Sequence, residues 1–180
     1  MNINSYLGIK LAGVLAITIL LQSCGGTVYV NASHTRNHVK DKILPLVAGK
    51  SVALENYYTN SKKVTIFEES NSTRLKGDLQ QYTDATLNIL KSELIKRDII
   101  VSDTGFKTIK LKISDVQATN KPFNKTTSLK LTANLGNGKS STITATYQTG
   151  GSSAQSLDGA IIAAITQLLK SEFLVGYINQ

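Results

Sequence analysis

The chain has 180 residues, a net charge of +8 and a single cysteine, Cys24. This length suits one domain of ordinary size with its own hydrophobic core, and is too short for two. One cysteine excludes an intramolecular disulfide. The folded part must therefore be stabilised by its core rather than by covalent cross-links.

The first 23 residues are typical of the signal peptide of an exported protein. Residues 1–10 carry Lys10 and no acid, and Thr18 is the one polar residue within residues 11–21. As a helix, that apolar run would span about 16 Å, roughly half of the ~30 Å hydrocarbon core of a bilayer. It is therefore too short for a comfortable membrane span and suits the core of a signal peptide.

The signal segment ends in Leu21-Gln22-Ser23-Cys24, which resembles the bacterial lipobox. The resemblance implies that a signal peptidase cuts between Ser23 and Cys24, and that the thiol of Cys24 carries diacylglycerol. The acyl chains would hold the mature protein to a membrane, because each buried CH₂ contributes about 0.8 kcal/mol. The alternative is an uncleaved signal anchor in which Cys24 is an incidental thiol.

Export would place the mature domain outside the cytoplasm, so no nucleic-acid partner is expected. Gly25 rather than Asp follows the cysteine. If the sorting rule of enteric-type bacteria applies, the protein is lipid-anchored in the outer membrane and faces the periplasm. Residues 24–49 are predicted to be the lipidated cysteine and a polar tether with a short strand at 27–30. About 19 flexible residues would reach on the order of 25 Å.

Residues 50–180 are predicted to form a single α+β domain. Short β-prone runs precede an amphipathic helix, and three longer strands then alternate apolar residues with Lys or Thr. Gly136-Asn137-Gly138 predicts a hairpin between the last two strands, since both residue types tolerate positive φ. The predicted strands are residues 51–58, 64–67, 99–101, 109–113, 129–135 and 142–147, and the predicted helices are residues 78–97 and 156–173.

The alternation in the long strands has an architectural consequence. Each strand is apolar on one face only, which is typical of an antiparallel sheet covered on one side. Two amphipathic helices would suffice to cover that side. The prediction is a two-layer sandwich in the order β-β-α-β-β-β-β-α, with a mostly antiparallel sheet and two helices on one face.

Two segments resemble the YajG-type family of small bacterial lipoproteins: residues 90–101 (LKSELIKRDIIV) and residues 156–170 (SLDGAIIAAITQLLK). The likeness extends over roughly residues 50–178, mainly in element order and hydrophobic pattern. Members usually carry Gly where this chain has Asp98, so a different helix-to-strand turn is expected. The same layout is similar to auxiliary lipoproteins of lipid transporters and to amino-terminal domains of other envelope proteins. The resemblance implies a fold and a location, and no catalytic residues.

Most of the excess positive charge lies in the strand-rich part of the chain. Between Phe106 and Lys139 there are seven lysines and one acid, a net charge of +6. Lys110, Lys112 and Lys130 would share the open face of the sheet and are the candidate site for an anionic ligand. Such a ligand would be a lipid headgroup, lipopolysaccharide or a cell-wall polymer. The alternative is a solvated face that serves solubility alone.

The sequence contains no nucleophile elbow, phosphate-binding loop or dinucleotide fingerprint. His34 and His38 have helical spacing but no third ligand nearby, so no metal or other cofactor is predicted. We therefore expect a non-enzymatic structural or protein-interaction component of the cell envelope, and an envelope hydrolase ranks last. Docking would use the open sheet face or an edge strand, and an exposed edge would also permit a homo-oligomer. The alternative function is an auxiliary binder of an anionic envelope ligand.

Overall fold

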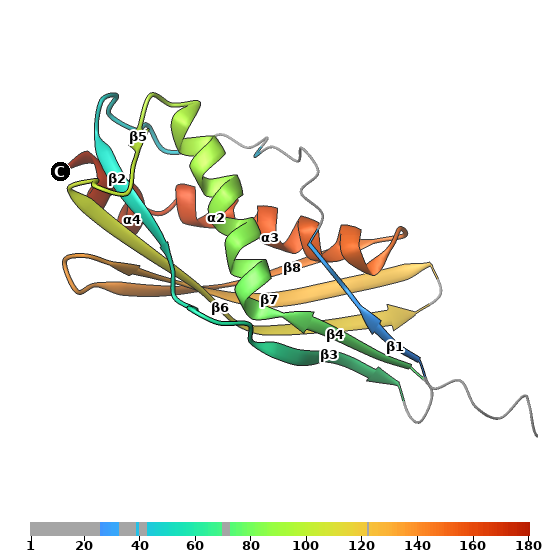
Figure 1. The fold of residues 1–180 in the computed structure, drawn as a ribbon. Helices are drawn as coiled ribbons and strands as arrows, with labels where there is room; N and C mark the ends of the chain where they lie inside the picture. The colour runs from blue at the N-terminus through green and yellow to red at the C-terminus, as the bar shows by residue number, and fades with distance from the viewer. Residues whose placement is uncertain (1–25, 33–38, 40–42, 70–72, 122) are drawn as a thin grey trace, which may run out of the picture.

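The computed structural model describes residues 26–32, 39, 43–69, 73–121 and 123–180. Cys24, His34 and His38 lie outside the described residues, so the signal peptide and the lipid attachment stay predictions. In the described part, two β-sheets form one layer, and the helices lie together above it (Figure 1).

The larger sheet has five strands in the order β5-β2-β6-β7-β8. Strand β6 pairs antiparallel with β7, and β7 pairs antiparallel with β8. Strand β2 runs parallel to both of its neighbours, β5 and β6. The strands are β2 (Ser51–Asn56), β5 (Ile100–Val101), β6 (Lys107–Lys121), β7 (Asn124–Leu135) and β8 (Ser140–Thr149).

The smaller sheet has three strands in the order β1-β4-β3. Strand β1 (Gly26–Tyr29) runs parallel to β4 (Thr73–Asp78), and β4 pairs antiparallel with β3 (Lys63–Glu69). Part of the segment expected to act as a tether is therefore folded. The chain after β1 is also fixed, because Val30 is buried and its carbonyl accepts a hydrogen bond from the Tyr82 hydroxyl.

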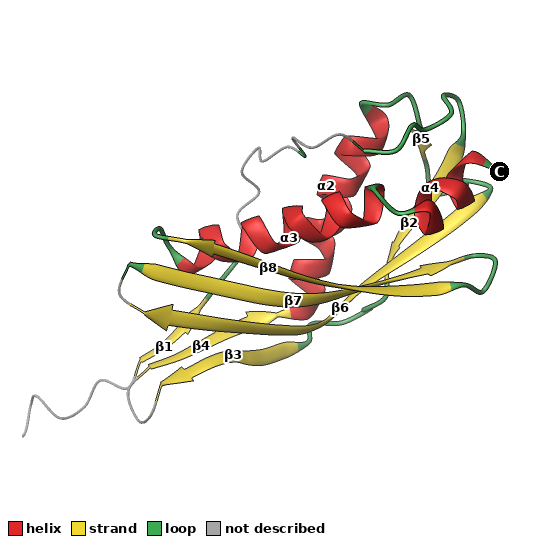
Figure 2. Cartoon of the chain, turned by 180° about the vertical axis from the view of Figure 1, so that it is seen from behind, coloured by secondary structure: helices red, strands yellow, loops and turns green. Residues whose placement is uncertain are grey.

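Helices α2 (Leu79–Ile95) and α3 (Ser153–Leu169) cover the same side of the larger sheet (Figure 2). Helix α2 packs mainly on β6 and β2, and α3 packs on β8 and β7. The apolar residues of the long strands face these helices and are nearly inaccessible to solvent. They include Ile109, Leu111, Ile113, Leu129, Leu131 and Ala145.

The α+β prediction, with helices on one side of the sheet, is confirmed. The expectation of a mostly antiparallel sheet is confirmed for β6, β7 and β8, although both sheets are mixed, because β1 and β2 run parallel to their neighbours. The long strands with one-sided alternation are the ones that pair antiparallel with one another. The path from β2 to β6 runs through β3, β4, α2 and β5, and this long crossover allows the parallel pairing.

The predicted closing helix, residues 156–173, is two helices in the structure. Helix α3 ends at Leu169, and α4 (Glu172–Asn179) follows at an angle of 58°. Ser171 is extended between them, and its hydroxyl accepts a hydrogen bond from the Leu174 N–H, which caps α4. The break lets Leu174 and Ile178 reach the same core as α3.

The turn between α2 and β5 contains Asp98 in the left-handed conformation, with φ of 60°. The N–H of Ile99 bonds to the carbonyl of Leu94, and the N–H of Asp98 bonds to that of Ile95. This pair of bonds defines a Schellman motif, whose left-handed position is usually glycine. Asp98 thus adopts a backbone conformation that glycine reaches without strain.

Replacing Asp98 with Gly is therefore expected to stabilise the protein by about 0.5–1 kcal/mol, since a side chain in this conformation is strained. Denaturant unfolding followed by circular dichroism would measure the gain. Asp98→Ala is the control, because alanine keeps the strain and lacks a side chain that tolerates this region. A Gly variant no more stable than the Ala variant would contradict the strain argument.

Candidate ligand-binding and docking surfaces

The three lysines proposed for anion binding do lie on the side of the larger sheet opposite the helices. Each alternates with a buried neighbour, and the β6–β7 register places Lys112 opposite Thr132 and Lys130 opposite Asp115. The side chains between them are mostly hydroxyls, with hydrogen bonds from strand to strand. These bonds join Thr132 to Thr142 and Thr146 to Ser128.

Carboxylates share this face with the lysines. Lys110 Nζ lies 2.9 Å from Glu55 Oε2, and Lys130 Nζ lies 3.4 Å from Asp115 Oδ2. Lys112 Nζ lies 4.3 Å from the centre of the Tyr57 ring, in cation–π geometry. The face therefore presents three cations beside two anions, which weakens the case for a strong anion site there.

A second basic group lies in a pocket at the end of the molecule that carries the C-terminus and α4. The pocket has a volume of about 630 Å³ and is open to solvent. Its wall combines two lysines, three hydroxyls and two apolar side chains that are exposed. The lining residues are Gly49, Lys50, Ser51, Ile100, Ser102, Thr104, Phe106, Lys107, Ile178 and Gln180.

The pocket is electropositive because its two lysines lie near each other. Lys107 Nζ donates to the carbonyls of Tyr177 and Ile178, at 2.8 and 3.1 Å, and lies over the Tyr177 ring. Burial, and then the charge of Lys50, lower the pKa of Lys107. No carboxylate among the described residues forms an ion pair with Lys50 or Lys107. Lys107 is held by two main-chain carbonyls, whereas Lys110 and Lys130 on the open face lie beside carboxylates.

A third surface is the free edge of the larger sheet, strand β8. Leu135 N–H bonds to Lys139 carbonyl across the hairpin, and the β7–β8 register then continues without a bulge. The alternation of an antiparallel ladder therefore turns the backbone groups of every second β8 residue away from β7. These residues are Ser140, Thr142, Thr144, Thr146 and Gln148.

The β8 edge lacks the usual features that block edge pairing. Its ten residues, SSTITATYQT, contain no charge and no proline. Natural edge strands are commonly protected by charges, proline, bulges or a covering segment. Within the described part of the chain, no backbone group bonds to the outward-facing groups of β8. The edge is thus free to pair with another strand.

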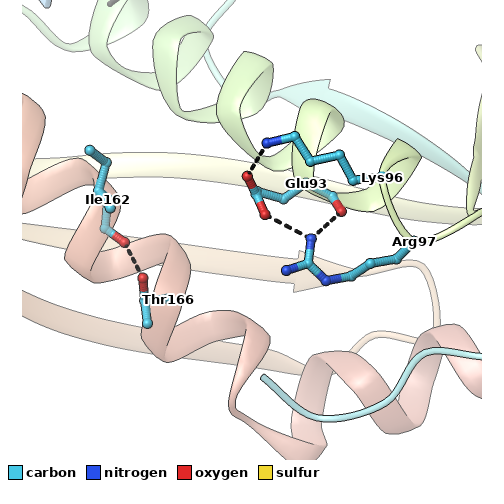
Figure 3. A network of polar contacts seen from close by, with 5 residues as sticks. All are labelled: Glu93, Lys96, Arg97, Ile162 and Thr166. Atoms are coloured by element: carbon cyan, nitrogen blue, oxygen red, sulfur yellow. Dashed lines mark hydrogen bonds and ion pairs between the residues drawn. The ribbon is translucent and has the colours of Figure 1, made fainter. Parts of the chain in front are cut away.

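The buried acid Glu93 has a structural explanation. Its carboxylate bonds to Lys96 Nζ at 2.8 Å and to Arg97 at 2.7 Å, and Arg97 also donates to the Glu93 carbonyl (Figure 3). Burial would raise the pKa of Glu93, but the two cations outweigh it and lower the pKa. An acid held ionised by two cations at a helix end is poorly suited to proton transfer.

Sequence analysis found the lysines of the open face but missed the pocket. Lys50 precedes β2 and Lys107 begins β6, and the parallel register that pairs Val52 with Lys107 brings them together. No spacing rule could have revealed this, because it depends on a long-range strand pairing. The exposed Phe106 next to Lys107 was the one local signal.

The described residues contain no group of three or more His, Cys, Asp or Glu side chains that could hold a metal ion. They also contain no single helix that is long and apolar enough to cross a membrane. The bent pair α3–α4 has that length and composition, but much of it is buried in the core.

Comparisons with known proteins inform the fold. No family model matches the sequence, and no curated protein matches it significantly. The structure is similar to the crystal structure of protein XCC0632 from Xanthomonas campestris, of family DUF330, with a TM-score of 0.50 and 10% sequence identity. The match covers 85% of this chain and 94% of that one. At this identity the likeness shows a shared fold alone, and the resemblance to the YajG-type family stays a prediction.

Proposed function

We propose that the protein is a lipid-anchored, non-enzymatic component of the bacterial cell envelope that docks onto a protein partner through the β8 edge. The observation that carries the docking role is the free, uncharged backbone edge of β8. An added strand would gain main-chain hydrogen bonds along this edge. The neighbouring Thr and Ser side chains of the open face would flank the added strand. The anchor is Cys24, at the end of the lipobox-like segment, and the outer membrane is the proposed location.

The register of β8 provides a sharp test of docking. Thr144 directs its N–H outward, so Thr144→Pro should leave the β7 ladder intact and yet block an added strand. Ile143→Pro should instead break the ladder and unfold the protein, because the Ile143 N–H faces β7. Circular dichroism would separate the two effects.

Docking itself would be measured by photo-crosslinking in cells of the native host. A photo-crosslinking residue at position 142 should yield a specific protein adduct, and the same residue at Asn88 on α2 should not. Thr144→Pro should remove the adduct from position 142. If the folded Thr144→Pro variant still forms the adduct at position 142, docking through this edge is refuted. If mass spectrometry shows that Cys24 carries no acyl chains, the anchor is refuted.

A second candidate function is binding of an anionic envelope ligand, favoured by the pocket with Lys50 and Lys107. The pocket has apolar side chains, hydroxyls and two cations, and no carboxylate in the described part of the chain forms an ion pair with either cation. That combination suits an anionic group attached to an apolar or sugar moiety. The lysines of the open face are less suited, because Glu55 and Asp115 pair with two of them.

Lys50→Gln is expected to weaken binding of short-chain phosphatidylglycerol several-fold, because one of two neighbouring cations is removed. Lys110→Gln on the open face is the matched control and should leave binding unchanged. Raising the salt from low to physiological strength should also weaken binding, since exposed charges are screened beyond about 8 Å. Isothermal titration would measure both effects. Equal losses in the two variants would exclude the pocket as the site.

A further inference from the structure

We infer that the protein rests on the bilayer with one defined end, formed by β1 and the turn between β6 and β7, which we call the membrane end. This inference rests on the proposed anchor at Cys24. The long axis of the molecule would then point away from the membrane surface. The pocket with Lys50 and Lys107 would open at the far end.

The position of the anchor is the first argument. Strand β1 begins at Gly26, two residues after Cys24. Two residues span at most about 7 Å, far less than the ~25 Å of a flexible tether. Acyl chains on Cys24 would therefore hold the start of β1 close to the lipid headgroups.

The arrangement of the strands adds a second part to this end. Both views place the start of β1 and the β6–β7 turn at one end of the molecule, and the C-terminus at the other (Figures 1 and 2). Strand β6 has 15 residues, which corresponds to a length of about 50 Å. The two ends are thus well separated, and the short link from Cys24 selects one of them.

The side chains at this end suit a lipid surface. Phe123, in the β6–β7 turn, is 93% exposed and has a positive φ of 57°. A bulky residue is strained in this conformation, and the exposed ring gains no packing within the chain in return. On β1, Val28 and Tyr29 are about half exposed. These apolar groups would be buried at a headgroup boundary.

The charge around Phe123 favours anionic lipid. Lys121 and Lys125 flank it, and the sequence has no acid between Asp115 and Lys130. Lys125 Nζ donates to the Lys121 carbonyl, which keeps its charge beside the turn. An aromatic ring between two cations is a common membrane-contact arrangement, in which the ring enters the interface and the cations meet phosphate groups. A bilayer with anionic headgroups is therefore the partner that we infer for the β6–β7 turn, whereas Glu68 and Glu69, at the end of β3 near the start of β1, add negative charge to the other part of this end.

The chain offers a matched pair of probes for a test. Phe106 and Phe123 flank the two ends of β6, and their exposures are 98% and 93%. With Cys24 acylated, a cysteine introduced as Phe123→Cys or Phe106→Cys is the sole free thiol for a fluorescent label. Both side chains are exposed, so neither substitution should disturb folding.

The labelled, full-length protein is reconstituted into vesicles of phosphatidylethanolamine and phosphatidylglycerol that contain a lipid-borne quencher. Quenching at position 123 should be several-fold greater than at position 106, and should decrease when phosphatidylcholine replaces phosphatidylglycerol. Equal quenching at the two positions, or stronger quenching at 106, would overturn the orientation. If quenching at position 123 does not depend on lipid charge, the role of Lys121 and Lys125 is overturned.

Mass spectrometry of the amino-terminal peptide before labelling distinguishes failure of the proposed anchor from failure of the proposed orientation. A chain without acyl groups on Cys24 refutes the anchor and the orientation that depends on it. An acylated chain whose 123 label is quenched no more than its 106 label refutes the orientation and leaves the anchor in place.

Discussion

Replacing Gly105 with Ala is expected to destabilise the protein by about 3 kcal/mol, the upper part of the range for overpacking. Gly105 lies in the connection between β5 and β6, directly against the backbone of β2. A Cβ atom at this position would lie 2.2 Å from the carbonyl carbon of Val52 and 2.4 Å from the nitrogen of Ala53. A side chain can rotate away from such a contact, but the backbone of a paired strand cannot.

The contact also supports the pocket, because Ser102, Thr104 and Phe106 lie in the same connection. For a domain of this size, the loss corresponds to a decrease in melting temperature of about 6–12 °C. Gly176→Ala in α4 is the control. No atom lies within 4 Å of an added Cβ there, so alanine should stabilise the helix by about 0.5–1 kcal/mol. If the Gly105→Ala variant had the same melting temperature as the wild-type protein, the close approach of Gly105 to the backbone of β2 would be disproved.

The elements that sequence analysis predicted well are those whose pattern records one-sided burial. Strands β6 and β7 alternate buried and more exposed residues over most of their length, and the predicted helix at 78–97 is α2, which buries Leu79, Tyr82 and Leu90. Strand β4 was missed because its sequence, TRLKGD, has one large apolar residue, Leu75. Its place depends on pairing with β1 and β3, which no local pattern records.

The surfaces show the same limit more strongly. The alternation placed Lys110, Lys112 and Lys130 on the open face, yet the pairing of two of them with Glu55 and Asp115 follows from strand register. The bulge between Ile113 and Asp115 in β6 is what turns Asp115 to the face of Lys130. A bulge shifts the face of every later residue, and the sequence alone does not indicate where it occurs.

The second large effect concerns Glu93, which is buried at the C-terminal end of α2. Its side chain is 3% exposed, whereas those of Lys96 and Arg97 are 42% and 25% exposed. Glu93→Gln should cost about 2 kcal/mol at neutral pH, because two charge-assisted hydrogen bonds lose their anion. The cost stays below that of a fully buried pair, since both cations can contact water once the anion is gone. Glu55→Gln is the control, and its surface pair with Lys110 should contribute less than about 1 kcal/mol.

The same variant should change the response to acid. The folded pKa of Glu93 is lowered, so the unfolded chain binds its proton more readily, and stability rises with pH through this range. The contribution is complete above the ordinary value of 4.5 and is lost as the pH falls through the lowered folded pKa. Hydrogen bonds also lower the pKa of Asp78 against the opposing effect of burial, so both proteins keep some acid sensitivity. The difference in unfolding free energy between wild type and Glu93→Gln should therefore decrease as the pH falls below 4.5. A difference that stays constant with pH would show that Lys96 and Arg97 do not hold Glu93 ionised.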